Sequence, residues 1–169
     1  MRHSSFAQMD CPIARSLERV GEWWSILILR DAFGGLTRFD EFEQSLGVAP
    51  NMLSRRLADL VTSGLLVKRR YNARPPRYEY LLTERGRDFR PVLMAMLAFG
   101  NKHFAPEGAS VIVVEAATGA PAEPIVVDRA SGRPLLEPEF VVVAGPAASA
   151  ATRARLAARA ARTVAEPRR

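Results

Sequence analysis

The basic residues of this 169-residue chain are concentrated between positions 51 and 77. This stretch holds one acidic residue, Asp59, and seven basic ones: Arg55, Arg56, Lys68, Arg69, Arg70, Arg74 and Arg77. Closely spaced arginine and lysine side chains neutralise phosphates, and a guanidinium can also pair with the edge of a guanine base. The chemistry that this stretch suits is therefore the binding of a nucleic acid.

The first half of the stretch is predicted to form a helix over Pro50–Ser63. Leu53, Leu57 and Leu60 recur at i, i+4 and i+7, which is the spacing of one buried helix face. Gly64 follows and is a typical residue at the end of a helix. The helix would therefore turn one face to a protein core and the other to solvent.

Four polar side chains of this helix are candidates for contact with DNA. At about 100° per residue, Asn51 and Arg55 project away from the leucines, where they could read base edges in a major groove. Ser54 is expected to contact a phosphate. Arg56 lies at the border of the buried face and either braces the helix or holds a phosphate. The competing interpretation is an ordinary solvated helix face.

A β-hairpin is predicted to follow, with strands at Leu65–Tyr71 and Arg77–Thr83 and a turn at Asn72–Pro76. Its basic side chains would hold the DNA backbone, and arginines near the turn could instead enter a narrow minor groove. The expected contacts of this wing are Lys68, Arg74 and Arg77.

Four further helices are expected, at Pro12–Val20, Glu22–Phe33, Arg38–Leu46 and Glu84–Phe104. Thr37 is the expected cap of the third and Thr83 of the fourth, and Pro91 should bend the fourth or lie near its first turn. The order of four helices, two strands and a helix predicts an α+β fold, a winged helix-turn-helix domain.

The chain after residue 105 has a different pattern. VVEAATGAP (113–121) recurs as VVDRASGRP (126–134), and each copy is predicted to form a short strand and a glycine-containing turn. A third strand at Phe140–Ala144 would complete a small antiparallel sheet. The polar residues of the two turns have the spacing of zinc-binding cysteine pairs. They supply no thiolate, so no metal site is expected.

These patterns divide the chain into four segments. We expect an N-terminal arm at 1–10, a DNA-binding and dimerisation domain at 11–104, a strand-rich appendage at 105–146 and an Ala/Arg-rich tail at 147–169. The tail is either helical or disordered. Residues 1–104 carry a net charge of +5, residues 105–147 of −4 and residues 148–169 of +5. The positive segments indicate a polyanionic partner.

Other classes of protein are disfavoured. No apolar run approaches the ~20 residues that span a membrane, and the N-terminal residues lack the apolar core of a secretory signal. The lone cysteine, Cys11, permits no intrachain disulfide and suits a reducing cytoplasm. No nucleophile–base pair and no phosphate-binding loop is recognisable, so we expect neither catalysis nor a cofactor.

Four segments are distinctive in combination: CPIARSLERVG, WSILILRDAF, RFDEFEQSLGVAPNMLSRRLADLVTSGLLVKRR and PPRYEYLLTERG. Together they resemble the HxlR-type winged-helix transcriptional regulators over Cys11–His103. The resemblance implies a dimeric DNA-binding protein in bacteria, with Pro50–Ser63 as the recognition helix and Tyr71–Tyr80 as the wing. It also implies that the first and last helices form the dimer interface. The apolar residues expected there are Ile13, Leu17, Val92, Met96 and Leu97.

The signal that such a regulator would sense is open. Some HxlR-type proteins resemble this chain in having a cysteine before the first helix, and there it senses oxidants. The helix dipole at Cys11 would favour a reactive thiolate, whereas the alternative is a structural thiol that acts as a small hydrophobe. An effector pocket is expected near Trp23, Trp24, Phe33 and the apolar face of Glu84–Phe104.

The sequence therefore predicts a homodimeric transcription regulator that binds double-stranded DNA and responds to a ligand or a redox signal. Its recognition helices would enter major grooves one helical turn (about 34 Å) apart at an inverted repeat. The alternative function is a winged-helix module that binds proteins, with the acidic appendage and the basic tail as docking elements.

Overall fold

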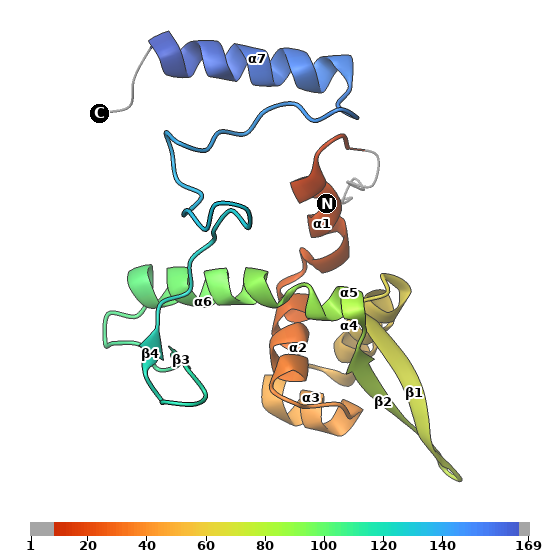
Figure 1. Ribbon diagram of the computed structural model, residues 1–169. Coiled ribbons are helices and arrows are strands. Elements are labelled where there is room, and N and C mark those ends of the chain that lie inside the picture. The colour runs from red at the N-terminus through yellow and green to blue at the C-terminus, as the bar shows by residue number, and fades with distance from the viewer. Residues whose placement is uncertain (1–8, 166–169) are drawn as a thin grey trace. The chain divides into compact units, whose positions relative to one another are not determined.

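The computed structural model describes residues 9–165. The chain divides into two compact units, one formed by Arg19–Val126 and the other by Met1–Glu18 together with Val127–Arg169. In chain order the elements are α1 (Pro12–Val20), α2 (Trp23–Phe33), α3 (Phe39–Leu46), α4 (Pro50–Thr62), β1 (Leu66–Ala73), β2 (Pro76–Leu82), α5 (Glu84–Arg87), α6 (Arg90–His103), β3 (Val113–Val114), β4 (Pro121–Ala122) and α7 (Ala150–Ala165) (Figure 1).

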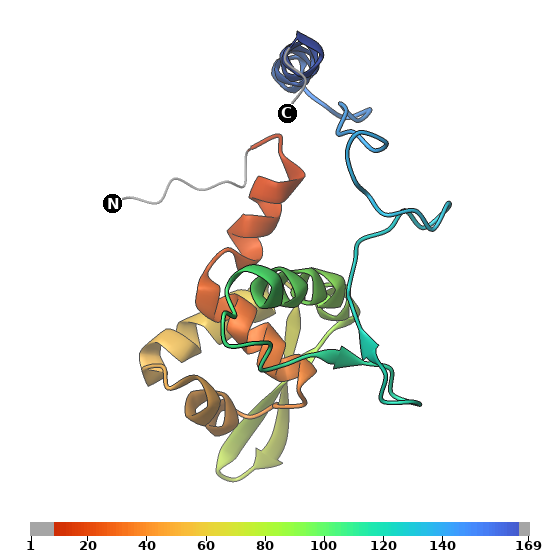
Figure 2. The same ribbon diagram turned by 90° about the vertical axis from the view of Figure 1, so that its left-hand side faces the viewer.

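The core of the Arg19–Val126 unit lies between α2, α3, α4 and the base of the β1–β2 hairpin. Its fully buried apolar side chains are Ile28, Leu29, Phe42, Leu53, Leu57, Leu60 and Leu66. The leucine face predicted for α4 is confirmed, and burial of each leucine contributes about 2 kcal/mol. The turn of the hairpin projects beyond the helices of this unit (Figures 1 and 2).

The start of α3 differs from the prediction. Thr37 is not its cap, because Arg38 occupies the cap position and α3 begins one residue later than expected. The carboxylate of Glu41 accepts hydrogen bonds from the backbone amides of Thr37 and Arg38, both at 2.8 Å. These bonds hold the pKa of Glu41 below its ordinary value. Gly47 ends α3 in the left-handed conformation, with φ of 60°, and opens the short turn into α4.

The wing is the antiparallel hairpin β1–β2, which is paired from Leu66 and Leu82 to Ala73 and Pro76, with a register shift between Arg70 and Asn72. Its turn is shorter than the predicted Asn72–Pro76, because only Arg74 and Pro75 lie between the last paired residues. The hairpin therefore extends further from the core than the sequence indicated.

The predicted long helix Glu84–Phe104 is interrupted between α5 and α6. Pro91 lies in the first turn of α6, where its missing amide needs no partner. Further inside a helix, its ring would clash with the carbonyl four residues earlier. The predicted cap is confirmed, because the Thr83 hydroxyl accepts a hydrogen bond from the amide of Gly86 at 3.0 Å.

The two sequence repeats form similar turns. In the first, which joins β3 to β4, the Thr118 hydroxyl donates to the Glu115 carboxylate at 2.6 Å. In the second, the Ser131 hydroxyl donates to the Asp128 carboxylate at 2.7 Å. The Ser131 hydrogen bonds lower the pKa of Asp128. Hydroxyl–carboxylate bonds therefore join the positions at which a zinc ribbon would have cysteine pairs.

The predicted third strand at Phe140–Ala144 is wrong, because this segment is assigned no strand in the described chain. Its three central valines are all exposed, and the structure gives them no partner strand. β-branched residues fit a pleated sheet, but a sheet forms only when a second strand supplies hydrogen bonds.

The tail is helical rather than disordered as far as residue 165, where the description ends. Its first turn is held by Asp10, whose carboxylate accepts a 2.7 Å hydrogen bond from the backbone amide of Ser149. Hydrogen bonds from the Ser149 amide, then from the Ser149 and Thr152 side chains, lower the Asp10 pKa from 3.8 to about 2. Asp10 therefore caps a helix that begins far along the chain.

Candidate nucleic-acid interface

The outer face of α4 carries the polar residues that the sequence placed there. Asn51, Ser54 and Arg55 are exposed, whereas Leu53 and Leu57 on the inner face are fully buried. The side-chain oxygen of Asn51 accepts the amide hydrogen of Met52 at 2.7 Å, which is a local bond within the first turn. α4 thus presents a guanidinium, an amide and a hydroxyl on one solvent-facing surface.

Arg56 differs from these neighbours. Its side chain is only 14% exposed, and its guanidinium lies 3.2 Å from the Asp59 carboxylate and 4.0 Å from that of Glu22. The buried Nε atom has no hydrogen-bond partner in the described structure. Of the two roles left open for Arg56, this geometry favours bracing α4 against the start of α2 over holding a phosphate.

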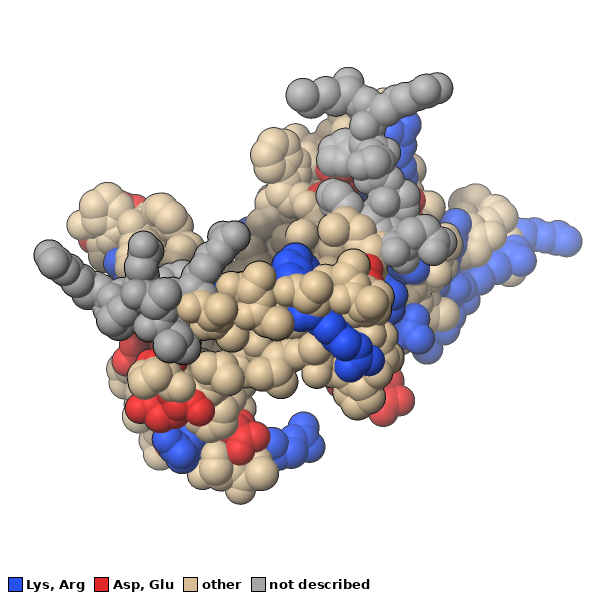
Figure 3. All heavy atoms as spheres, turned by 90° about the horizontal axis from the view of Figure 1, so that it is seen from above, with Lys and Arg blue, Asp and Glu red and all other residues tan. Residues whose placement is uncertain are grey.

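The wing supplies further exposed cations. Lys68, Arg74 and Arg77 are all exposed, and the Lys68 ammonium lies 4.2 Å from the centre of the Tyr78 ring. An ammonium held over an aromatic face keeps its charge while its position is restrained. Figure 3 shows blue Lys and Arg side chains gathered at the right-hand edge of the molecule, where the wing projects.

Two other wing arginines are engaged within the hairpin. Arg69 pairs with Glu79 across the two strands at 2.7 Å. Arg70 donates to the carbonyl of Asn72 at 3.1 Å and also to that of Ala73. The Arg69 contact links the two strands, and the Arg70 contacts are made to the end of its own strand next to the turn.

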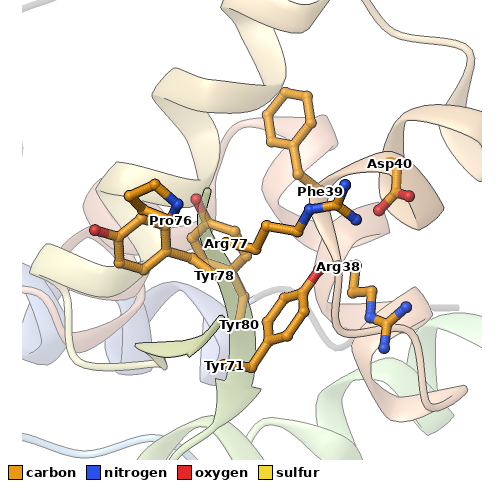
Figure 4. Close-up of a pocket in the computed structure, with 8 residues that line it drawn as sticks. All are labelled: Arg38, Phe39, Asp40, Tyr71, Pro76, Arg77, Tyr78 and Tyr80. Carbon is orange, nitrogen blue, oxygen red and sulfur yellow. The ribbon is translucent and has the colours of Figure 1, made fainter. Parts of the chain in front are cut away.

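A cleft of about 450 Å³ separates the start of α3 from the wing. Figure 4 shows Tyr71 and Arg77 reaching from the wing toward Arg38 and Asp40. The Arg38 guanidinium lies 5.0 Å from the centre of the Tyr71 ring, and the Tyr80 amide donates to the Thr37 carbonyl at 2.7 Å nearby. Burial raises the pKa of the Tyr80 hydroxyl above its ordinary value.

Arg38 was missed by sequence reasoning, because the capping signal was assigned to its neighbour Thr37. The sequence nevertheless held a signal that Arg38 is the cap residue. Glu41 stands three residues after it, which is the spacing at which a carboxylate reaches back to the cap amide. Arg38 therefore joins the exposed cations of this surface, together with Arg55, Lys68, Arg74 and Arg77.

The apolar residues predicted at a dimer interface are mostly exposed. Ile13 and Leu17 on α1 are 72% and 48% exposed, and Val92 and Met96 on α6 are 46% and 47% exposed. Leu97 is half-buried and lines a groove with Ile112 and Val113 of the following segment. The exposed members are large apolar side chains that remain open to solvent over about half of their surface or more in the single chain.

The remaining predicted sites are placed as follows. Cys11 is half-buried, and its carbonyl accepts the Arg15 amide in the first turn of α1. Trp24 and Phe33 pack against the core, whereas Trp23 is 74% exposed, so the three do not form one pocket wall.

Among residues 9–165 no group of His, Cys, Asp and Glu could hold a metal ion. No helix in this range is long and apolar enough to cross a membrane.

The helix-turn-helix and wing match a known family. A model described as HxlR-like helix-turn-helix matches residues 19–108, which is more than half of the chain. The chain belongs to this family. An uncharacterized HTH-type transcriptional regulator of Mycobacterium tuberculosis is 35% identical over 135 residues, which cover 79% of this chain and 85% of that protein.

Solved structures of related proteins share the fold of this HxlR-like chain. A proposed transcription factor of Pseudomonas aeruginosa is 57% identical, with a TM-score of 0.63, and the match covers 86% of this chain and all of that one. The redox regulator HypR in its reduced form is 29% identical, with a TM-score of 0.52, over 54% of this chain and 92% of that one. The P. aeruginosa match extends well beyond the family model, so it includes part of the appendage.

Proposed function

We propose that this HxlR-like chain is a sequence-specific transcription regulator that binds an inverted-repeat operator as a homodimer in the cytoplasm. Membership of a family of helix-turn-helix transcriptional regulators supplies the general function. The observation that carries the specific proposal is the outer face of α4. There Asn51, Ser54 and Arg55 are exposed, and Lys68, Arg74 and Arg77 are exposed on the wing that follows α4.

The proposed contacts divide into two groups. Asn51 and Arg55 read base edges in the major groove, because an amide can pair with adenine and a guanidinium with guanine. The others hold the phosphate backbone and position α4 without reading sequence. This second group consists of Ser54, Arg38, Lys68, Arg74 and Arg77. Arg56 takes no direct part, since its guanidinium is engaged with Asp59.

Dimerisation sets the distance between two copies of this surface. We assign DNA binding and dimerisation to residues 11–104, and we treat 105–146 and 147–169 as appendages, with residues 1–10 as an arm. The exposed apolar residues of α1 and α6 would pack against a second copy of the chain. Two recognition helices could then enter successive major grooves of one operator.

The direct test is selection of binding sites from a random duplex pool with the full chain. We expect an inverted repeat to be enriched. Arg55→Ala should lose discrimination between the selected and a random duplex, while Lys68→Ala should weaken binding to both by a similar factor. Wild-type protein that binds neither duplex, while it captures a protein partner after nuclease treatment, would instead support the protein-interaction function.

A redox response is a further proposal, favoured by the likeness to HypR, which is described as a redox regulator. We place it at Cys11, the half-buried thiol that directly precedes Pro12 at the start of α1. Oxidation with diamide should then join two chains through Cys11 and weaken operator binding. If diamide changes neither, and Cys11→Ser behaves as wild type, the thiol is structural.

A further inference from the structure

Helix α7 lies outside the residues that the family model matches, and its composition is unusual. Ala150–Ala165 contains four arginines and no aspartate or glutamate. Over residues 148–169 the sequence holds six basic residues and one acidic residue. Alanine and arginine are strong helix formers, so this composition supports the helix while concentrating positive charge on it.

α7 touches the rest of its own unit through one narrow face. Thr152 and Leu156, four residues apart, are the only half-buried positions between 150 and 161. The Thr152 hydroxyl donates to the Asp10 carbonyl at 3.4 Å, and α7 lines a groove with Val141–Val143 through Leu156, Arg159 and Ala160. The other side chains of this part of α7 are exposed, including Arg155 and Arg159.

The exposed surface of α7 excludes two common kinds of helix partner. A helix that lies on a membrane or enters a coiled coil needs a stripe of large apolar residues. The sequence of α7 has only Leu156 and Val164 of this kind, and Leu156 already contacts its own unit. What α7 offers to a partner is therefore positive charge on a small alanine surface.

The placement of the charges also indicates a polyanion. Arg155 and Arg159 stand at i and i+4, which places both exposed guanidinium groups on one side of α7. A row of phosphates is a complementary partner for several cations spaced along one helix. The 16-residue helix is about 24 Å long, and one DNA strand carries a phosphate about every 3.4 Å of helix axis.

We propose that α7 is a second DNA-binding element, which contacts the phosphate backbone of double-stranded DNA and adds affinity without reading sequence. This inference rests on the proposed DNA-binding function and assigns a role to the C-terminal extension. It predicts that α7 strengthens binding to operator and random duplexes by the same factor, because phosphates are the same in both.

The test uses the full chain and the double variant Arg155→Gln/Arg159→Gln. The probes are the selected operator and a random duplex of equal length. Loss of two phosphate contacts should make the slope of log K against log salt less steep by about 1.8 for both probes. Their affinity ratio should stay unchanged. Arg155→Lys/Arg159→Lys retains the charge and should retain the slope, which separates a loss of charge from a loss of helix.

A matched control removes two arginines from the same unit outside α7. Arg129→Gln/Arg133→Gln should leave the salt slope unchanged. An unchanged slope in the α7 double variant, or an equal change in this control, would overturn the proposal. So would a change in the oligomeric state of the α7 variant with DNA affinity intact, which would indicate a protein partner. Wild-type protein that binds no DNA would instead contradict the proposed function.

Discussion

The hydroxyl of Thr83 donates a 2.6 Å hydrogen bond to the carbonyl of Gly64 and accepts the amide hydrogen of Gly86 at 3.0 Å. One side chain therefore joins Gly64, which follows the C-cap of α4, to the end of the wing and the first turn of α5. The backbone amide of Thr83 also donates to the Leu65 carbonyl at 3.1 Å. The angle at which the wing leaves the core depends on these bonds.

Replacement of Thr83 by Val retains the shape of the side chain but removes its hydrogen bonds. We expect a loss of about 1–2 kcal/mol in the free energy of unfolding, because a cap and a partly buried bond are lost together. Urea denaturation of the purified chain measures this loss. Thr62→Val, at an exposed position on α4, serves as the control and should change stability by less than about 0.5 kcal/mol.

Gly86 is expected to be intolerant of any side chain. A Cβ at this position would lie 2.1 Å from the Leu65 carbonyl oxygen, so α5 would have to move away from the base of the wing. Gly86→Ala should therefore cost about 1–3 kcal/mol. Gly100→Ala in α6 is the matched control, because no atom lies within 4 Å of its added Cβ. The control should stabilise the chain by about 0.5–1 kcal/mol through helix propensity, and equal effects of the two changes would contradict the prediction.

Truncation of the two neighbouring arginines on α4 should affect different properties, stability for Arg56 and DNA discrimination for Arg55. Arg56→Ala removes a mostly buried stem and the contact with Asp59, so it should lower the free energy of unfolding by about 1–2 kcal/mol. Arg55→Ala should change stability by less than about 0.5 kcal/mol but abolish discrimination between duplexes. Urea denaturation measures the stability of both variants, and titration with the two duplexes measures their discrimination. Equal stability losses would contradict the assignment of Arg56 to bracing.

Elements with a strong local signal were predictable from the sequence. The leucines of α4 repeat at the spacing of a helix face. Helix geometry alone therefore places Arg55 on the solvent side once Leu53 and Leu57 are buried. The Thr83 cap was also predictable, because a threonine before a helical pattern satisfies an otherwise unpaired amide. These features depend on residues that are close in sequence.

Features that depend on distant partners were not predictable. Arg38 stacks on Tyr71 only because the start of α3 bridges to Glu79 in the wing, far along the chain. The role of Arg56 depends partly on Glu22, which belongs to another helix. The Asp10 cap of α7 joins opposite ends of the chain. Local periodicity carries no information about any of these contacts.

Docking of α7 onto Asp10 should depend on pH in strongly acidic solution. The Asp10 pKa is lowered from 3.8 to about 2, mainly by the hydrogen bond from the Ser149 amide. The stability that the ionised carboxylate gives to the start of α7 is therefore fully present above pH 3.8, the pKa of the unfolded chain. This stability is lost as the pH falls through about 2, because protonation removes the charge that accepts these bonds. Helicity of the wild type should therefore fall over this range more than that of Asp10→Asn, as measured by circular dichroism. Parallel curves for the two proteins would contradict the cap.

The proposed dimer can be tested at Met96, which is 47% exposed on α6 in the single chain. Met96→Lys places an unpaired charge in an apolar contact, which should shift the chain from dimer to monomer in sedimentation. Affinity for a full inverted repeat should then fall toward that for a half-site, because two recognition helices no longer bind as one unit. Ile125→Lys, at another exposed apolar position, controls for the added charge. If both variants remain dimers with full operator affinity, the interface does not include α6, and the spacing of the recognition helices is set elsewhere.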